Sequence, residues 1–426
     1  MIGLRLAIHR TFHSLRVRNF RLYFLGQMVS VTGTWMQSVA SAWLVLQLTG
    51  SGVALGVVTA LSFLPILLLG PWGGVIADRF DKRHTLVATQ AAFAALAAVL
   101  GILTLAGLVQ VWQVYLLSLA QGLVTAVDNP NRQSFVMEMV GQDDLTNAVS
   151  LNSAVMTGTR IVGPALAGVL IATVGLAACF LVNAVSYVAV IVGLLSMRPR
   201  DLFRKPSRGG RAGRAIEGLR YVWRDPGIRD PLVLMAVVFT LSFNFSVLFP
   251  LMAKWAFHGD AGTLGLLLAT MGTGSLVGAL LLAHRAKPSR RMQPIAAVAF
   301  GGMTVAVALA PTVATEIPLL VLLGLSSVTF MITGNSTIQL AASDEMRGRV
   351  MALYGMVFLG TTPIGAPIAG WMAQSLGVRF ALGAGGVVAA VAGLVAARVF
   401  KHAAYGKAEQ VPVAADTPQP GNSGPT

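Results

Sequence analysis

The sequence contains few charged residues and a single cysteine. Of its 426 residues, 11% are charged and 55% are apolar, and the mean hydropathy is +0.73. Soluble domains carry roughly a quarter charged residues, and folding buries at most about three quarters of the surface of a chain. A soluble globular enzyme is therefore excluded. The lone Cys179, within an apolar run, excludes a disulfide framework and a cysteine-based metal site.

Two further absences restrict the function. The sequence has no Gly-x-x-x-x-Gly-Lys-Ser/Thr string and no soluble stretch that could form an ATP-binding domain. No apolar stretch carries the clustered His, Asp or Glu that a membrane-embedded enzyme would need. None of the acidic residues is placed in the middle third of a span, and Asp260 and Glu316 are expected in periplasmic-side loops. We expect no catalysis, no cofactor and no metal.

The chain is instead rich in apolar stretches of about 20 residues or more, the length of a transmembrane helix. The predicted fold class is an all-α integral membrane protein with twelve transmembrane helices in two six-helix bundles that are pseudo-repeats of each other. The expected spans are 22–48, 53–77, 85–107, 111–130, 148–174, 176–197, 231–254, 262–284, 293–311, 317–340, 348–376 and 379–400.

The basic residues predict the orientation. If both termini are cytoplasmic and the spans alternate, 28 of the 31 Lys and Arg residues fall in cytoplasmic segments, as the positive-inside rule requires. The net charge of +15 is then a topology signal and not a nucleic-acid footprint. We expect a monomeric multi-pass protein of the cytoplasmic (inner) membrane whose partners are the lipid bilayer and a small molecule.

The loops divide the chain into five segments. The longest expected loop is basic and glycine-containing, and helical spacing in its second part predicts a short surface helix around 216–223. The end of the chain is rich in Pro, Gly and Ala, which is typical of disorder. The expected segments are an amphipathic cytoplasmic segment (1–21), an N-terminal bundle (22–197), a cytoplasmic central loop (198–230), a C-terminal bundle (231–400) and a disordered cytoplasmic tail (401–426).

An internal repeat relates spans five and eleven. Residues 158–168 and 360–370 match at three glycines, one Thr and one Ala with a constant offset of 202. The matching place of the two segments within each half indicates a parallel duplication. Small residues allow close helix contacts in membranes. The predicted packing or hinge residues are Gly163, Pro164 and Gly168 in span five, and Gly365, Pro367 and Gly370 in span eleven.

The loop between spans two and three carries a gating candidate. Positive-inside anchoring explains Arg79, Lys82 and Arg83, but it does not explain Gly74 or Asp78. Gly74 would let helices approach closely. Asp78, at the helix end, could bridge to a cation or to a helix N-terminus of the neighbouring bundle, near span eleven. We expect these five residues to form a gating loop.

The loop string 74–83 resembles the signature of the major facilitator superfamily, Gly-x-x-x-Asp-Arg-x-Gly-Arg-Arg/Lys. Asp81 departs from its second Gly, and Lys82 replaces an Arg. The resemblance implies two six-helix bundles around a central cavity, with alternating access. Further segments look like the enterobactin-exporter and macrolide-efflux branch of this superfamily: Trp35-Met36-Gln37, Leu48-Thr49-Gly50-Ser51, residues 129–133, residues 160–168 and Arg347-Gly348-Arg349-Val350.

Polar residues recur at spacings of three and four in spans one, four and five, which places them on one face of each helix. Polar groups at membrane depth normally face a cavity or another helix, so a wet cavity and helix–helix contacts are both open. Polar residues of spans seven and ten could supply the opposite wall. The candidate cavity or substrate residues are Gln27, Thr34, Trp35, Gln37, Ser118, Gln121, Arg160, Asn244, Asn335 and Gln339.

Two residues are candidates for coupling. Arg160 lies roughly 18 Å inside span five at about 1.5 Å per residue, near the midplane. Antiporters of this superfamily often carry an Arg in span four, where this chain has Ser118, and the resemblance implies that Arg160 takes part of that role. Arg160 could also be structural, tied to backbone carbonyls. Asp128 is the second candidate, and an ion pair with Arg132 would equally explain it.

These patterns favour a secondary active exporter of small amphiphilic molecules, such as a siderophore or a hydrophobic drug. Whether protons drive it stays open. An uptake permease of the same fold is the alternative, followed by a non-transporting membrane receptor.

Overall fold

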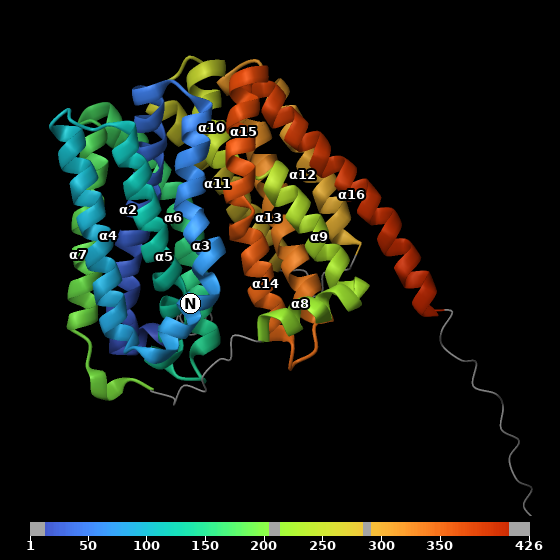
Figure 1. Ribbon diagram of the computed structural model, residues 1–426, viewed down its shortest axis with the longest axis horizontal. Helices are drawn as coiled ribbons and strands as arrows, with labels where there is room; N and C mark the ends of the chain where they lie inside the picture. Colours follow the sequence, from blue (N-terminus) through green and yellow to red (C-terminus); the bar gives the residue numbers. More distant parts are fainter. Residues whose placement is uncertain (1–12, 204–213, 284–290, 409–426) are drawn as a thin grey trace, which may run out of the picture.

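The computed structural model describes residues 13–203, 214–283 and 291–408, and within them the side chains of 70–79, 214–216, 283 and 401–408 are excepted. Every regular element in these ranges is a helix. Helices from the first half of the chain lie together on one side of the molecule, and those from the second half lie on the other (Figure 1).

Six long helices form the N-terminal half. Two of their ends show why the chain turns where it does: Gly50 adopts a left-handed conformation after the first helix, with φ 60°, and the Asp81 side chain caps the third by accepting from the His84 backbone N–H. The helices are α2 (Arg18–Thr49), α3 (Gly52–Arg79), α4 (Lys82–Leu105), α5 (Val111–Val140), α6 (Leu145–Thr173) and α7 (Leu176–Leu195).

The C-terminal half contains two broken helices. Pro363 lies in the first turn of α15, where its missing N–H and the restriction on the preceding residue separate α15 from α14. The span-seven segment breaks at Asn244 between α9 and α10 and then continues as the π-helix η3. The elements are α8 (Arg214–Arg224), α9 (Pro226–Leu241), α10 (Phe245–Leu251), η3 (Met252–Ala256), α11 (Ala261–Ala283), α12 (Met292–Leu309), α13 (Val313–Ala341), α14 (Arg347–Gly360), α15 (Thr362–Leu376) and α16 (Val378–Ala408).

The expected segments need three changes. Helix α5 runs ten residues past 130, because Pro130 is accommodated inside it. Spans seven and eleven are each broken, where one continuous helix was expected. Helix α16 continues to Ala408, so the expected tail begins inside a helix. The surface helix expected near 216–223 is present as α8, and residues 1–12 of the expected amphipathic segment lie outside the described residues.

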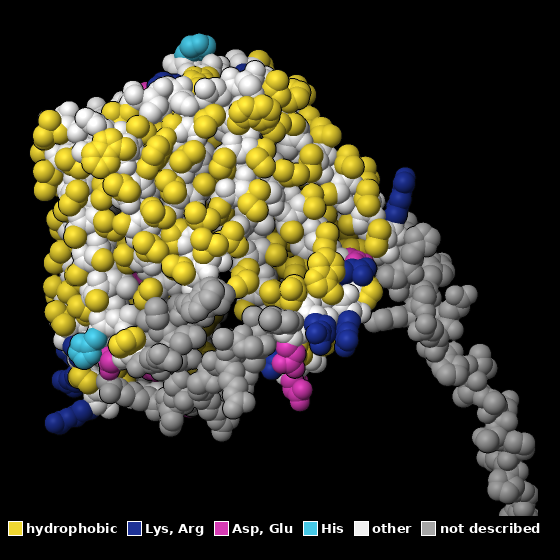
Figure 2. Space-filling view, in the orientation of Figure 1, with side chains coloured by type: hydrophobic (Ala, Val, Ile, Leu, Met, Phe, Trp, Pro, Cys, Tyr) yellow, Lys and Arg dark blue, Asp and Glu magenta, His cyan; other side chains and the backbone are white. Residues whose placement is uncertain are grey.

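Large apolar side chains are exposed on the helices of both halves. Ten helical segments in the described ranges are long and apolar enough to cross a membrane. The remaining two long helices, α2 and α5, have 32 and 30 residues and more polar faces. Hydrophobic side chains cover the flanks, while most of the visible charged side chains gather near the lower edge (Figure 2). This distribution is the one expected of a membrane protein.

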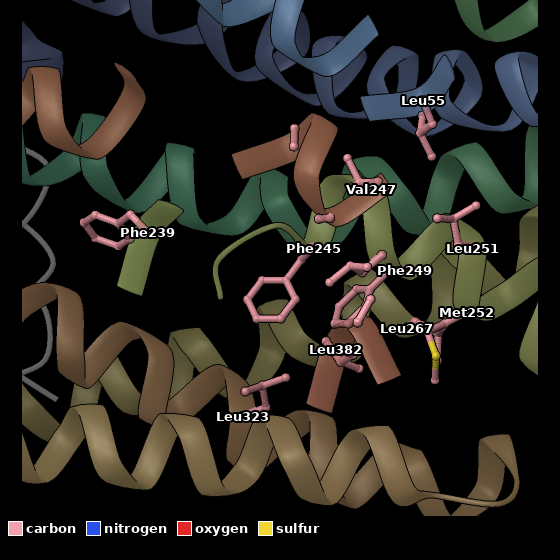
Figure 3. Close-up of a cluster of buried hydrophobic side chains, with 14 of the residues drawn as sticks. Leu55, Phe239, Phe245, Val247, Phe249, Leu251, Met252, Leu267, Leu323 and Leu382 are labelled. Atoms are coloured by element: carbon pink, nitrogen blue, oxygen red, sulfur yellow. The ribbon is translucent and has the colours of Figure 1, made fainter. Parts of the chain in front are cut away.

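The core of the C-terminal half is dense and apolar. Phe245 and Phe249 lie close to Leu382 of α16, while Phe239 and Leu323 of α13 lie at the edges of the same cluster (Figure 3). All five of these side chains are buried. The packing fixes the helices that face the other half.

The two halves meet most closely at one end, which we call the closed end. It holds the turns at 50–51, 257–260 and 377, at the top of Figure 1. The open end is the opposite one and holds the turn between α3 and α4. Two pairs of helices join the halves, α3 with α15 and α6 with α11.

Candidate functional site

Glycines bring the halves into backbone contact at the closed end. A methyl group placed on Gly370 of α15 would overlap the Gly52 carbonyl oxygen of α3. In the second helix pair, a methyl group on Gly265 of α11 would lie 2.6 Å from the Pro164 carbonyl oxygen of α6. The packing role predicted for Pro164 and Gly370 therefore has a geometric basis, and the repeated motifs of spans five and eleven occupy corresponding contacts.

The other predicted packing residues lie along the same helices. A methyl group on Gly168 would come within 3.1 Å of the Gly262 Cα, across the halves. Gly163 packs against Trp35 within the N-terminal half, and Gly365 packs against the Thr240 carbonyl within the C-terminal half. Pro367 borders Gly56 across the halves, since a methyl group there would lie 2.9 Å from the Pro367 Cα.

Three hydrogen bonds cross the halves at the closed end. The Gln374 side-chain oxygen accepts from the Ser51 hydroxyl at 2.7 Å and from the Val53 backbone N–H at 3.1 Å. From the other side, the Lys254 ammonium donates to the Leu46 carbonyl at 2.6 Å. These contacts close this end of the space between the halves.

Arg160 lies in the part of α6 that packs beside α11. A methyl group on Gly272 of α11 would approach the Arg160 carbonyl oxygen at 3.4 Å. The Arg160 guanidinium carbon stands 5.1 Å from the Trp35 ring centroid, a cation–π distance. The Arg160 side chain is exposed although it stands near the middle of α6.

The face of α6 below Arg160 is open and polar. Ser150 and Ser153 are exposed, and their hydroxyls donate to the carbonyls one turn earlier, as does that of Thr157. The predicted stripe therefore points into accessible space and ends at Arg160. This arrangement offers a cation and an aromatic face to a molecule that enters from the open end.

The polar residues near the open end of α2 and α5 form a buried ionic cluster instead. Asp128 accepts from the Arg132 Nε at 2.9 Å, from the Thr89 hydroxyl at 2.7 Å and from the Gln90 amide at 3.0 Å. Arg132 also donates to the Gln27 side-chain oxygen. Asp128 and Gln27 are each 2% exposed. The ion pair that the sequence offered as one explanation of Asp128 is present.

A second network links α2, α5 and α7. Gln37 accepts from the Asn183 amide at 2.7 Å and donates to the Gln121 side-chain oxygen at 3.4 Å. Thr34 and Tyr187 share a hydrogen bond of 3.1 Å between their hydroxyls. Most of the predicted polar face of span one is therefore used for contacts between helices of one half. Ser118 of α5 is buried as well.

The candidates from the C-terminal half lie at two places, Asn244 between α9 and α10 and the pair Asn335 and Gln339 one turn apart on α13. Asn244 is 2% exposed, and its amide donates to the Thr240 carbonyl at the break between α9 and α10. Asn335 is half-buried and hydrogen-bonds the Tyr354 hydroxyl, while Gln339 is exposed toward the open end of α13. A substrate contact for these three residues stays a prediction.

The predicted gating loop is described only in part. Lys82 forms an ion pair of 2.5 Å with Glu138. The Arg83 guanidinium donates to the Leu194 and Leu195 carbonyls at 2.7 and 2.8 Å, at the end of α7. These contacts of Lys82 and Arg83 are therefore all made within the N-terminal half. Gly74, Asp78 and Arg79 belong to α3, but their side chains lie outside the described residues.

The sequence reasoning missed two features. Asn183 and Tyr187 organise the second network, and a lone Asn in the apolar span six was the available signal. Glu316, expected in a loop, is fully buried in the first turn of α13. The Thr312 and Thr315 capping box, just before it, marks the true start of that helix. In the described ranges, no three His, Cys, Asp or Glu side chains gather as a metal site would require.

Comparison with known protein families identifies the family of this chain. Residues 9–421 match the family described as transmembrane secretion effector, within the major facilitator superfamily. The chain belongs to this family. The resemblance seen in the sequence is thereby confirmed, and the protein is a membrane transporter.

Its relatives include transporters of several compounds. The staphyloferrin A transporter of Staphylococcus aureus is 24% identical over 361 residues, which cover 84% of this chain and 90% of the relative. Macrolide efflux protein A of Streptococcus pyogenes is 24% identical, with 85% and 92% covered. The multidrug efflux pump Tap of Mycolicibacterium fortuitum is 27% identical, with 84% and 90% covered.

Solved structures share the fold. A bacterial homologue of the human lysosomal transporter Spinster, in an inward-facing and unoccupied conformation, matches with a TM-score of 0.73 and 14% identity over 90% of this chain and 97% of that one. A variant of the peptide transporter POT also matches with a TM-score of 0.73 and 14% identity, covering 90% and 94%. The secretion effector is therefore an all-helical, multi-pass protein of the major facilitator fold.

Proposed function

We propose that this secretion effector is a secondary active exporter of small amphiphilic molecules, either siderophores or hydrophobic drugs, which works by alternating access. The names of the relatives support this substrate range, since they include a staphyloferrin A transporter and efflux proteins for macrolides and for several drugs. No catalysis, nucleic-acid binding or oligomer is needed for this function.

The proposed orientation places the open end and both termini on the cytoplasmic side of the cell membrane. Basic residues concentrate there in the sequence, at 79–83 and 198–229 among other segments. The closed end then faces the periplasm. In this orientation the transporter accepts cargo from the cytoplasm, which is the loading state of an exporter.

The proposed architecture is twelve spans in two six-helix repeats. The ten apolar segments together with α2 and α5 make twelve. The equivalent positions of Gly168 and Gly370 at the two contacts between halves support the repeat. The two halves would rock about these glycine contacts to open one end and close the other.

The observation that carries the proposal is the exposed Arg160 beside Trp35, near the middle of α6. A guanidinium binds a carboxylate or another anion through paired donors, and the indole face and apolar helices suit an aliphatic or aromatic body. A molecule that carries both features would bridge α2, α6 and the opposite half.

The test is accumulation of a panel of siderophores and antibiotics in cells with and without the protein. We expect lower accumulation of anionic amphiphiles in cells that carry it. Arg160→Lys should cut transport per inserted molecule by tenfold or more, because an ammonium lacks the planar five-donor fork, a difference of about 1.4 kcal/mol or more. Arg220→Lys, on an exposed position of α8, is the matched control. Unchanged turnover in both Arg160→Lys and Arg160→Gln would contradict the role of Arg160.

A further inference from the structure

Glu316 is a buried acid that the proposed function leaves unused. It is 0% exposed in α13, and neither of its side-chain oxygens has a hydrogen-bond partner among the described residues. An unpaired carboxylate costs several kcal/mol in such a place, whereas the neutral acid avoids most of this cost. The buried, unpartnered position of Glu316 therefore favours the protonated, neutral form of its side chain.

The charged groups around Glu316 leave it one electrostatic partner. Arg379, at the start of α16, is the residue whose charge acts on it. Helices α11 and α12 contribute no charged side chain along their lengths. Helices α9 and α14 also pack on α13, but their charged side chains lie near the starts of these helices, toward the open end: Arg229, Asp230, Arg347 and Arg349. Asp260 caps α11, where hydrogen bonds from the Thr263 backbone lower its pKa, and Lys254 of η3 donates to Leu46.

Arg379 is engaged elsewhere while Glu316 is unpaired. Its guanidinium donates to the Ala308 carbonyl at 3.1 Å and also to the Ala310 carbonyl, at the end of α12. It also stands 5.5 Å from the Phe257 ring centroid. An ionised Glu316 would compete with these neutral partners, because a guanidinium binds a carboxylate more strongly than it binds a carbonyl.

Arg379 lies near residues that form the closed end, so a change in its partner from the α12 carbonyls to Glu316 would act on this end. Phe257 follows η3, whose Lys254 reaches across to Leu46. Arg379 itself comes five residues after Gln374, which holds Ser51 and Val53 of the other half. The next residue after Phe257, His258, has a left-handed φ of 51°, a strained conformation for a residue with a side chain.

We propose that Glu316 is a proton-binding switch of the closed end. When Glu316 is protonated, Arg379 stays bound to α12 and Phe257, and the closed end stays shut. When Glu316 is ionised, it draws Arg379 away from these partners and favours opening of this end. This inference rests on the alternating access proposed above. Closing the end takes up a proton, so the closed population increases as the pH falls and decreases as it rises. The ligand of this site is a proton, which would come from the periplasmic side that the closed end faces.

The test measures the distance across the closed end by pulsed electron spin resonance in nanodiscs. Spin labels would be attached at Leu108→Cys and Leu376→Cys, which replace exposed residues of the two halves, in a Cys179→Ala background. From about pH 5 to about pH 8, we expect the ratio of closed to open molecules to fall tenfold or more, since one proton allows at most about tenfold per pH unit. Glu316→Gln should stay closed throughout, and Asp143→Asn, an exposed acid at the open end, should respond like its parent.

Two results would overturn the proposal: a pH response in Glu316→Gln equal to that of its parent, or a parent that does not respond to pH. Glu316→Asp keeps a titratable acid and should keep a response, which separates loss of the proton from loss of the fold. Export by the same labelled parent separates the two proposals. A parent that exports without a pH response refutes the proton switch alone, and a parent that neither exports nor changes distance refutes the proposed function.

Discussion

The interiors of the two halves are built from different chemistry. Near its open end, the N-terminal half contains the buried pair of Asp128 and Arg132, and Gln37 and Asn183 add a second polar network. The C-terminal half contains a cluster of rings around Phe300, which stacks on Phe243 at 5.2 Å and on Phe330 at 6.4 Å between centroids. An ion pair and amide contacts link helices of the first half, whereas stacked rings fill much of the second, beside single buried polar groups such as Asn244 and Glu316.

This difference predicts different responses to mutation. Loss of one member of a buried polar pair leaves its partner unsatisfied, which costs more than the pair contributes. Aromatic packing tolerates exchanges that conserve volume. Small chemical changes should therefore harm the N-terminal half more than the C-terminal half.

The largest effect should follow Asp128→Asn. The change leaves the Arg132 guanidinium buried without its anion and should lower the free energy of unfolding by about 3–5 kcal/mol. The thermal unfolding midpoint of the purified protein in detergent would measure this loss. The double variant Asp128→Leu with Arg132→Met should recover part of the stability. A single variant as stable as the wild type would show that the pair is not needed.

The next largest effect should come from Gly370→Ala. Its methyl group would overlap the Gly52 carbonyl oxygen, whereas the methyl group of Gly168→Ala lies 3.1 Å from a Cα and needs a smaller adjustment. Overpacking of this kind costs about 1–3 kcal/mol, which would act against the closed end. Transport per inserted molecule should fall further for Gly370→Ala than for Gly168→Ala. Equal rates would mean that the two contacts between halves carry the same strain.

Phe300→Leu should have a smaller effect, although Phe300 is 0% exposed. Leucine keeps most of the apolar contact, so the expected loss in the free energy of unfolding is about 1 kcal/mol. The same thermal unfolding assay would measure it beside Asp128→Asn. If Phe300→Leu were the more damaging of the two, the contrast between polar and aromatic interiors would be wrong.

The smallest effect should follow Lys82→Gln. In its ion pair with Glu138, 17% and 15% of the two side chains are accessible, against 15% and 3% for Arg132 and Asp128, so the two pairs differ mainly in the burial of the acid. Pairs close to solvent contribute about 0.2–1 kcal/mol. Thermal unfolding in low and high salt would show a small shift that salt removes. A loss as large as that of Asp128→Asn would indicate that burial does not set the cost.

The sequence predicted much of the fold because the length of an apolar stretch is a local property of the chain. The twelve expected spans all correspond to helices of the structure, yet the breaks at Asn244 and Thr361 were not foreseen. Near the first break, the Ser242 hydroxyl donates to the Gly385 carbonyl of α16, a contact between segments far apart in the sequence that local patterns do not show.

The site was harder to predict than the fold. Spacing shows which residues share a helix face, and this was correct for Ser150, Ser153 and Arg160 on α6. Spacing does not show what a face meets. The face of α2 through Gln27 and Gln37 meets helices of its own half, and Glu316 is buried by segments distant in sequence.

The central claim is that the two ends of one cavity open in turn, and cysteine labelling tests it most directly. In a Cys179→Ala background, Ser153→Cys on the exposed polar face of α6 should react with a membrane-impermeant maleimide in inside-out vesicles. Ala261→Cys is 3% exposed at the closed end and should be protected from the same reagent in right-side-out vesicles. A transported compound should reduce the first reaction and increase the second. If both positions keep their reactivity while the compound is exported, the alternating-access account is contradicted.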